Sequence, residues 1–199
     1  MTDALAIDGD VQDLLFRTAR TANTFTGEPV SDEQVRAIYD LVKWAPTSMN
    51  IQPLRVVLVR SPEARERLVE HMSEGNKAKT STAPLVAVLA GDSGFHEHIP
   101  HVYPPRAAAR ENLAEVPEVR ARMATFNGAL QVGYFIVGVR AAGLAAGPMG
   151  GFDAEAVAKE FFPGGGHQVL AVVNIGKPGP DAWRPRNPRL DYDQVVTTV

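Results

Sequence analysis

The chain has 199 residues, of which 45% are hydrophobic and 22% charged, and its formal net charge is -3. These values are ordinary for one soluble globular domain, and the slight acidic excess argues against nucleic-acid binding, which needs a basic patch. The absence of cysteine excludes disulfides, cysteine-ligated metals and a cysteine nucleophile. Residues 1–10 hold no basic residue, and no apolar run approaches the ~20 residues of a membrane helix. We therefore expect a cytoplasmic protein without a signal peptide or membrane span.

The N-terminal half is predicted to hold two helices, a strand and a third helix. Apolar residues at helical spacing predict a helix over residues 11–20, and a second helix begins after Ser31, a good N-cap. This second helix should end before Pro46, because a residue that precedes proline disfavours helical angles. The β-branched run 54–60 predicts a strand, and the Ser-Pro pair that follows it predicts the start of the third helix.

The C-terminal half is predicted to hold two buried strands, two helices and an extended tail. The apolar runs 84–90 and 168–175 each predict a buried strand. Apolar side chains point all around the helix predicted for 125–142, so that helix should be buried on most sides. A Gly-rich segment and a short helix over 153–162 follow it. The proline-rich tail 176–199 cannot form a compact element alone and should lie on another surface, such as a second subunit. The order of elements predicts a single α+β domain.

Residues 92–106 contain three prolines and three histidines, and they are predicted to form a long functional loop. His96, His98 and His101 lie close together, but their spacing matches no strong metal pattern and no carboxylate-rich motif stands nearby. We therefore expect a solvated loop and no metal. The sequence also contains no Walker A loop, no dinucleotide-binding glycine motif and no serine-nucleophile elbow.

Three polar clusters remain as candidates for chemistry: residues 20–23, 46–53 and 184–189. Arginine supplies forked, permanently charged donors suited to phosphate, hydroxyl groups add neutral donors, and Asn and Gln amides satisfy the mixed edge of a heterocycle. Each cluster also has a structural explanation, namely a surface ion pair, an ordinary helix-to-strand turn and solvated charge, respectively. Residue types alone leave both interpretations open.

In order and spacing, these clusters resemble the nitroreductase family. The resemblance implies an α+β fold, with a central, mainly antiparallel sheet flanked by helices. It also implies one FMN-binding domain over 1–199 and an intertwined homodimer, in which residues 176–199 form an arm over the partner. The matching stretches cover nearly the whole chain: ARTANTF (19–25), WAPTSMNIQPLRVVLV (44–59), GN (75–76), GLAAGPMGGFD (143–153) and NIGKP (174–178) with the Arg-rich tail.

The resemblance further implies FMN as the cofactor, with NADH or NADPH as co-substrate. Arginines and a threonine would hold the doubly charged phosphate, with the participation of Arg184 left open, and Asn76 would meet the pyrimidine edge. A backbone N–H from Gly150 or Gly151 would hydrogen-bond flavin N5, since glycine lets the backbone approach closely. The expected cofactor-binding residues are Arg20, Thr21, Asn23, Pro46, Thr47, Ser48, Asn50, Gln52, Asn76, Pro148, Met149, Gly150, Gly151, Arg186 and Arg189, with residues 46–52 coming from the other subunit.

The implied activity is ping-pong hydride transfer from NAD(P)H to a small acceptor, with no catalytic triad. Residues 75–84, 147–153 and 187–194 are most similar to the malonic semialdehyde reductases of the Rut pyrimidine-degradation pathway, which implies 3-oxopropanoate as acceptor. Its carboxylate would need a partner such as Arg106 or a loop histidine. A broad nitroarene, quinone or enone reductase and a flavin-storage protein without turnover stay open as alternatives. No pattern distinguishes NADH from NADPH.

Overall fold

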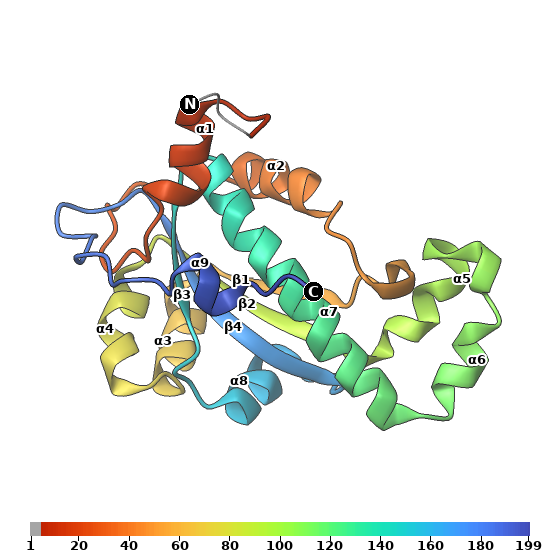
Figure 1. The fold of residues 1–199 in the computed structure, drawn as a ribbon. Coiled ribbons are helices and arrows are strands. Elements are labelled where there is room, and N and C mark those ends of the chain that lie inside the picture. The colour runs from red at the N-terminus through yellow and green to blue at the C-terminus, as the bar shows by residue number, and fades with distance from the viewer. Residues whose placement is uncertain (1–4) are drawn as a thin grey trace.

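The computed structural model describes residues 5–199, so the first four residues of the acidic N-terminus lie outside the description. A single sheet runs through the centre of the molecule and helices cover both of its faces (Figure 1). Its strand order is β1-β2-β4-β3, and every neighbouring pair is antiparallel, which confirms the predicted α+β architecture. The strands are β1 (Leu54–Val59), β2 (Leu85–Asp92), β3 (Ala145–Met149) and β4 (His167–Gly176).

The helices form two layers around this sheet. Helices α2 and α7 lie on one face, and α3 and α8 lie on the other (Figure 1). Three 3₁₀ turns cover Ser48–Asn50, Ser93–His98 and Pro104–Arg106. The helices are α1 (Gly9–Gln12) continued by a π-helix (Asp13–Arg17), α2 (Asp32–Val42), α3 (Pro62–Glu70), α4 (Glu74–Thr82), α5 (Ile99–Val102), α6 (Ala109–Ala114), α7 (Pro117–Ala141), α8 (Ala154–Phe161) and α9 (Tyr192–Val195).

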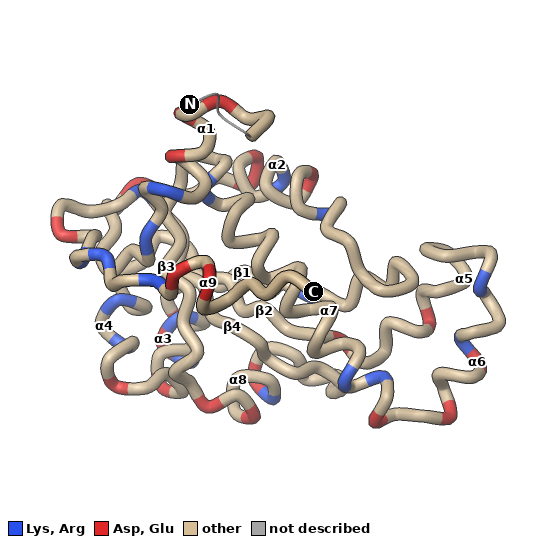
Figure 2. Tube along the Cα trace, in the orientation of Figure 1, with Lys and Arg blue, Asp and Glu red and all other residues tan. Residues whose placement is uncertain are grey.

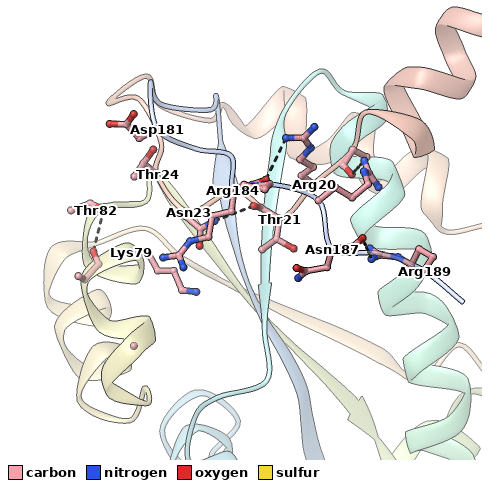
Figure 3. A pocket seen from close by; sticks show the side chains of 15 residues that line it. Arg20, Thr21, Asn23, Thr24, Lys79, Thr82, Asp181, Arg184, Asn187 and Arg189 are labelled. Atoms are coloured by element: carbon pink, nitrogen blue, oxygen red, sulfur yellow. Dashed lines mark hydrogen bonds between the residues drawn. The ribbon is translucent and has the colours of Figure 1, made fainter.

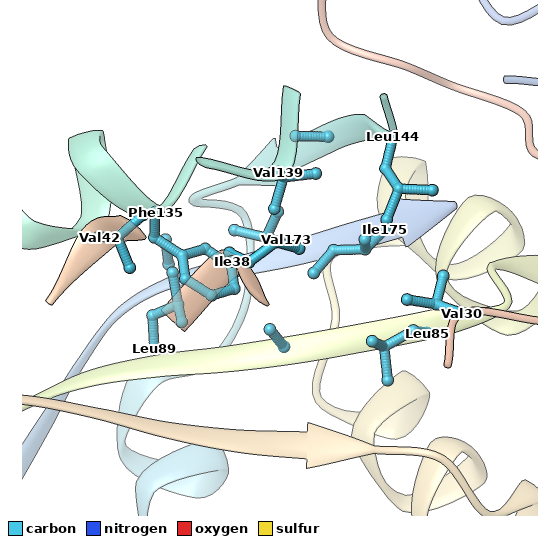
Figure 4. Packing of buried hydrophobic residues seen from close by; sticks show 13 residues of the cluster. Val30, Ile38, Val42, Leu85, Leu89, Phe135, Val139, Leu144, Val173 and Ile175 are labelled. Carbon is cyan, nitrogen blue, oxygen red and sulfur yellow. The ribbon is translucent and has the colours of Figure 1, made fainter. Parts of the chain in front are cut away.

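The central strand β2 divides the core into its two halves. All eight of its residues are buried, as expected for a strand covered on both faces. Leu85 and Leu89 pack with α2 and α7 (Figure 4), whereas Val86 and Val88 pack with α3 and α8. This alternation follows from the two-residue period of side chains along a strand. The apolar run that predicted this strand is therefore explained by its position between two helical layers.

The first helix ends earlier than predicted. Its last turns are a π-helix, and the chain leaves it at Thr18 rather than at Arg20. The helix does not continue, because the backbone of the next residues forms hydrogen bonds with another part of the chain. Ala22 N–H donates to the Ala146 carbonyl at 3.0 Å, so this segment lies beside β3. The Gly-rich stretch predicted around β3 thus contains a strand, because its backbone pairs with β4 along residues 145–149.

The predicted loop 92–106 is instead a helical excursion, here defined as residues 93–116. It contains two 3₁₀ turns, α5 and α6, and it leads into α7. Phe95 and Ile99 are fully buried and pack with Ile51 and Ala124. These two apolar residues, four positions apart, anchor the excursion to the domain. Helix α7 also begins eight residues before the predicted start at Thr125, with Pro117 in its first turn.

Helix α7 is less buried within one chain than predicted. Phe126, Leu130 and Tyr134 are 65%, 42% and 47% exposed. The neighbouring helix α2 also exposes Tyr39 and, just beyond its end, Trp44, at 61% and 78%. The two helices pack against each other, so the molecule presents large apolar side chains on adjacent elements.

The tail predicted as an arm over a partner begins by packing on its own chain. Thr26 N–H donates to the Lys177 carbonyl at 2.9 Å, and Gly179 N–H donates to the Thr24 carbonyl at 3.1 Å. Ala182 is fully buried. From Trp183 onward every residue is exposed. The early part of the tail is therefore packed on this domain, and Arg186 extends the contact through its hydrogen bond to the Ala19 carbonyl.

Candidate functional site

A cavity of about 990 Å³ lies where the N-terminal segment, the C-terminal tail and α4 meet (Figure 3). Its walls come from three parts of the chain that are distant in sequence. Two of the predicted polar clusters, 20–23 and 184–189, lie on it together. The lining residues are Ala19, Arg20, Thr21, Asn23, Thr24, Gly75, Ala78, Lys79, Thr82, Asp181, Arg184, Pro185, Arg186, Asn187 and Arg189.

Backbone contacts hold the two terminal segments against each other. Asn23 N–H donates to the Ala182 carbonyl at 3.0 Å. The guanidinium of Arg186 donates to the Ala19 carbonyl at 2.9 Å, and that of Arg20 donates to the Arg184 carbonyl at 3.3 Å. Each arginine therefore bonds the backbone of the other segment. The donors that these bonds leave over on each guanidinium remain available to a ligand.

The cavity is strongly cationic. Arg20, Lys79, Arg184, Arg186 and Arg189 line it, against the single carboxylate of Asp181. Within residues 5–199, none of these five cations forms an ion pair with a carboxylate. Figure 2 shows Lys and Arg gathered beside β3 and α4. Unpaired like charges in one cavity repel one another, so the site is suited to an anion of multiple charge, such as a phosphate.

Lys79 is partly buried in this cationic cavity. Burial lowers the pKa of its ammonium below the ordinary value, and the nearby charge of Arg184 lowers this pKa further. Both effects disfavour the charged form. A bound anion would act in the opposite direction, and an anion bound beside Lys79 would therefore favour its charged form.

Beside the cavity, Asn76 and Gly151 lie in direct contact. The Asn76 amide donates to the Gly151 carbonyl at 2.8 Å. A Cβ added to Gly151 would lie only 2.7 Å from Asn76 Nδ2, so this close approach requires glycine. A Cβ added to Gly150 would meet nothing within 4 Å. Gly150 therefore faces open space that protein atoms do not fill.

The two residues that precede this glycine pair, Pro148 and Met149, belong to β3. The Met149 side chain is buried, and its sulfur accepts a hydrogen bond from Thr80 Oγ1 at 3.7 Å. It packs in the core with α3 and α8. The Met149 side chain is therefore not available to a ligand, and the prediction of a cofactor contact there is limited to main-chain atoms.

The third predicted cluster does not reach the cavity of its own chain. Pro46, Thr47, Ser48, Asn50 and Gln52 are absent from its walls. Instead, Ser48 N–H donates to Asn127 Oδ1 at 2.7 Å, and Asn50 Nδ2 donates to the Val102 carbonyl at 2.8 Å. The segment therefore lies beside α7 and the helical excursion, while the cavity lies beside α4. In one chain the expected cofactor residues form two separate groups.

Sequence reasoning missed Lys79, because no helix was predicted between residues 74 and 82. That stretch is rich in small and charged residues and carries no apolar stripe, and only Thr80 is buried. The run Gly75-Asn76-Lys77-Ala78-Lys79 belongs to a stretch that resembles a motif of the family. A helix over this run places Gly75 and Lys79 one turn apart. That spacing was the available signal.

The histidine region offers no second centre of chemistry. Across residues 5–199, no group of His, Asp and Glu is arranged to hold a metal ion. His96 is buried, with Nε2 at 3.3 Å from the Glu97 carboxylate. Arg106 and the histidines do not line the cavity. In this same range, no helix has the length and apolar character to cross a membrane.

The sequence matches the nitroreductase family model over residues 17–177, and the chain belongs to this family of FMN-dependent oxidoreductases. A relative from Streptomyces coelicolor, provisionally named NADH dehydrogenase/NAD(P)H nitroreductase, is 64% identical over 98% of this chain and 100% of its own. A provisionally named nitroreductase from Exiguobacterium sibiricum, solved with FMN, is 19% identical, with a TM-score of 0.85 over the whole of both chains. A gut-bacterial enone reductase is 18% identical, with a TM-score of 0.81 over 97% and 99%. These solved structures share the fold.

Proposed function

We propose that the chain is an NAD(P)H oxidoreductase whose FMN phosphate is bound in the cationic cavity. The observation that carries this proposal is the convergence of Arg20, Arg186 and Arg189, unpaired with carboxylates, on one cavity. Thr21 lines the same wall and adds a hydroxyl donor. Three guanidinium groups match the double charge and the several oxygens of a phosphate monoester. Lys79 and Arg184 add further positive charge at the same site.

The residues beside the cavity fit the rest of the cofactor. The Asn76 side chain donates its amide nitrogen to the Gly151 carbonyl, which leaves its amide oxygen as the acceptor for a heterocycle. The open space at Gly150 leaves room for a planar ring system next to the backbone of β3. Backbone N–H groups of Gly150 and Gly151 are then the donors for the ring nitrogen N5. Bound FMN supplies the hydride chemistry, accepting hydride from the nicotinamide and giving it to the acceptor.

The proposed active form is a homodimer, with segment 46–52 of one copy completing the site of the other. Two observations support it. Within one chain this segment lies away from the cavity, bonded to Asn127 and Val102. The large exposed side chains on and just beyond α2 and on α7, such as Trp44 and Phe126, form the kind of apolar surface that marks protein interfaces. The exposed residues that follow Arg189, which lie outside the walls of the cavity, are then the part of the tail that extends over the partner.

The acceptor we propose is 3-oxopropanoate, reduced to 3-hydroxypropanoate. The support is the similarity of residues 75–84, 147–153 and 187–194 to malonic semialdehyde reductases. The surplus of cations in the cavity also favours an acidic acceptor over a neutral one. Neither Arg106 nor the excursion histidines line the cavity, so a carboxylate partner is sought first at Lys79 or Arg184.

A second candidate acceptor class is nitroarenes, quinones and enones. The named relative and the gut-bacterial enone reductase favour this broader activity. A flavin-binding protein without turnover is the alternative of another class. Incubation of the purified protein with FMN, NADH or NADPH and a panel of acceptors separates the three. Stoichiometric formation of 3-hydroxypropanoate supports the aldehyde. Reduction of nitroarenes and enones alone supports the second, and flavin binding with no NAD(P)H oxidation supports the third.

A further inference from the structure

Segment 46–52 has an unusual backbone. Met49, Asn50 and Gln52 have φ angles of 53°, 55° and 43°, in the left-handed region that residues with a Cβ rarely adopt. Ile51, which lies among them, is only 1% exposed, whereas Asn50 is exposed. Such conformations persist only where the surrounding structure over-determines them, and they gather at functional sites. Contacts with other elements must therefore hold this segment in its conformation.

Two amide side chains on α7 bind the backbone on either side of the left-handed residues, at Ser48 and at Leu54. Asn127 Oδ1 accepts a hydrogen bond from Ser48 N–H at 2.7 Å, and Gln131 Oε1 accepts one from Leu54 N–H at 2.9 Å. Both amides are buried, at 1% and 7% exposure. They stand four residues apart and so lie on the same face of the helix, one turn from each other. The two acceptors fix the N–H groups on either side of the left-handed residues.

The position of these acceptors is set by other contacts. Asn127 Nδ2 donates to the Met123 carbonyl at 2.9 Å, so the amide oxygen is directed at Ser48. Helix α7 cannot shift easily, because it lies close to the sheet at Gly128. Four residues earlier, the backbone of α7 also lies against Gly91 of β2, where an added Cβ would lie 2.8 Å from the Ala124 carbonyl oxygen. The amides are thus carried by a helix that core packing holds in place.

We infer that Asn127 and Gln131 are positioning residues, which keep segment 46–52 in the one backbone conformation that presents Ser48 and Asn50 outward to a ligand. The inference rests on the proposed function, since the ligand in question is the flavin of a second copy of the chain. Neither amide lines the cavity or reaches the cofactor site. They act through the segment, because they bind the N–H groups that flank its left-handed residues.

The test compares two substitutions of Gln131 in the full-length protein. Gln131→Met keeps the size of the side chain and removes the acceptor, whereas Gln131→Glu keeps an acceptor oxygen for Leu54 N–H. Hydrogen exchange over residues 47–55, FMN titration and the visible circular dichroism of bound flavin are measured for each. For Gln131→Met we expect faster exchange and FMN binding weakened about five- to tenfold, as for one lost buried hydrogen bond. For Gln131→Glu we expect exchange to return to near the wild-type rate at about pH 4, where the buried carboxyl is largely uncharged and its oxygen still accepts from Leu54 N–H. Thr125→Val, on the same helix but without contact to the segment, should change neither.

Wild-type exchange over residues 47–55 in Gln131→Met would overturn the inference. So would a folded Gln131→Glu protein whose exchange at about pH 4 is as fast as that of Gln131→Met, because the defect would then be one of general packing. The exchange measurement needs no cofactor. A wild-type protein that binds no FMN therefore contradicts the proposed function, while the exchange data still decide whether the two amides position the segment.

Discussion

Arg20 carries the most direct prediction at the scale of single residues. Its guanidinium lines the cavity, and its one hydrogen bond, to the Arg184 carbonyl, is long at 3.3 Å. Removal of a charged donor from a phosphate costs about 1.5–3 kcal/mol, which is about ten- to a hundredfold in affinity. We therefore expect Arg20→Met to weaken FMN binding by that factor in a fluorescence titration. Lys159→Met, an exposed cation on α8, is the control and should bind FMN as the wild type does. Equal affinities for the two variants would contradict this role of Arg20.

The adjacent glycines make a matched pair. In Gly151→Ala the new Cβ would clash with Asn76 Nδ2 at 2.7 Å and crowd Ser73 Oγ at 3.1 Å, whereas in Gly150→Ala it would meet open space. We expect Gly151→Ala to destabilise the protein without FMN by about 1–3 kcal/mol, and Gly150→Ala to change its stability by less than about 0.5 kcal/mol. Urea unfolding of the two cofactor-free variants measures the difference. A similar loss in both would mean that the space beside Gly150 is filled in solution.

The sequence predicts which polar residues lie together better than it predicts residues on an element with no clear pattern, while their role in binding a cofactor stays a prediction. Arg20 and Arg186 were predicted to share an anion site, and they line one cavity. Lys79 was missed because its helix has no apolar stripe. Met149 was expected at the cofactor, yet its side chain is buried in the core, because alternation along β3 directs it inward.

At the scale of elements, a carboxyl group in the first turn of α2 and another in the first turn of α3 make the stability of the protein depend on acidic pH. Hydrogen bonds from its own backbone and then from Ser31 lower the pKa of Glu33 below 4.5, and the same two causes, with Ser61, lower that of Glu63. A lowered folded-state pKa means stability that is present above about pH 4.5 and lost as the pH falls through the folded value. We expect the double variant Glu33→Gln, Glu63→Gln to lose less stability on acidification than the wild type. Thermal unfolding at about pH 6 and about pH 3.5 tests this. Glu66→Gln, in the middle of α3, is the control, and a pH response equal to wild type in the double variant would contradict the expectation.

Elements with strong local signals were predicted with nearly correct bounds. Helix α2 begins at its Ser31 cap, which forms a capping box with Gln34, and β2 follows its apolar run. Strand β3 was missed because its sequence, Ala-Ala-Gly-Pro-Met, has low strand propensity and depends on pairing with β4. Residues 92–106 were predicted to form a loop, because their prolines and short turns conceal the buried anchors Phe95 and Ile99.

At the scale of the whole molecule, the exposed apolar side chains of α2 and α7 explain why α7 has an apolar pattern on all sides. We expect the protein to sediment at twice the chain mass. Trp44 is 78% exposed in one chain, so Trp44→Asp should leave the folded chain intact while placing an unpaired charge in the interface. Sedimentation equilibrium should show a shift toward monomer, with a parallel loss of FMN affinity because segment 46–52 no longer completes the site. Trp44→Phe is the conservative control. A monomeric wild type that binds FMN tightly would remove the reason for a shared site.

The sequence predicts only in part where the C-terminal tail lies. Proline content indicated that residues 176–199 need a surface on which to lie. It could not indicate that Lys177 to Ala182 would use their own chain, because those contacts are backbone hydrogen bonds to residues 23–26. Backbone pairing of this kind leaves little trace in side-chain patterns.

The most direct measurement of the central claim is equilibrium titration of cofactor-free protein with FMN, followed by flavin absorbance and fluorescence at low and high salt. The expected result is saturation at one FMN per chain, with affinity that falls as salt screens the five cavity cations. Riboflavin, which lacks the phosphate, should bind much more weakly. Equal binding of riboflavin and FMN, or no spectral change on adding FMN, would contradict the assignment of the cavity to the flavin phosphate.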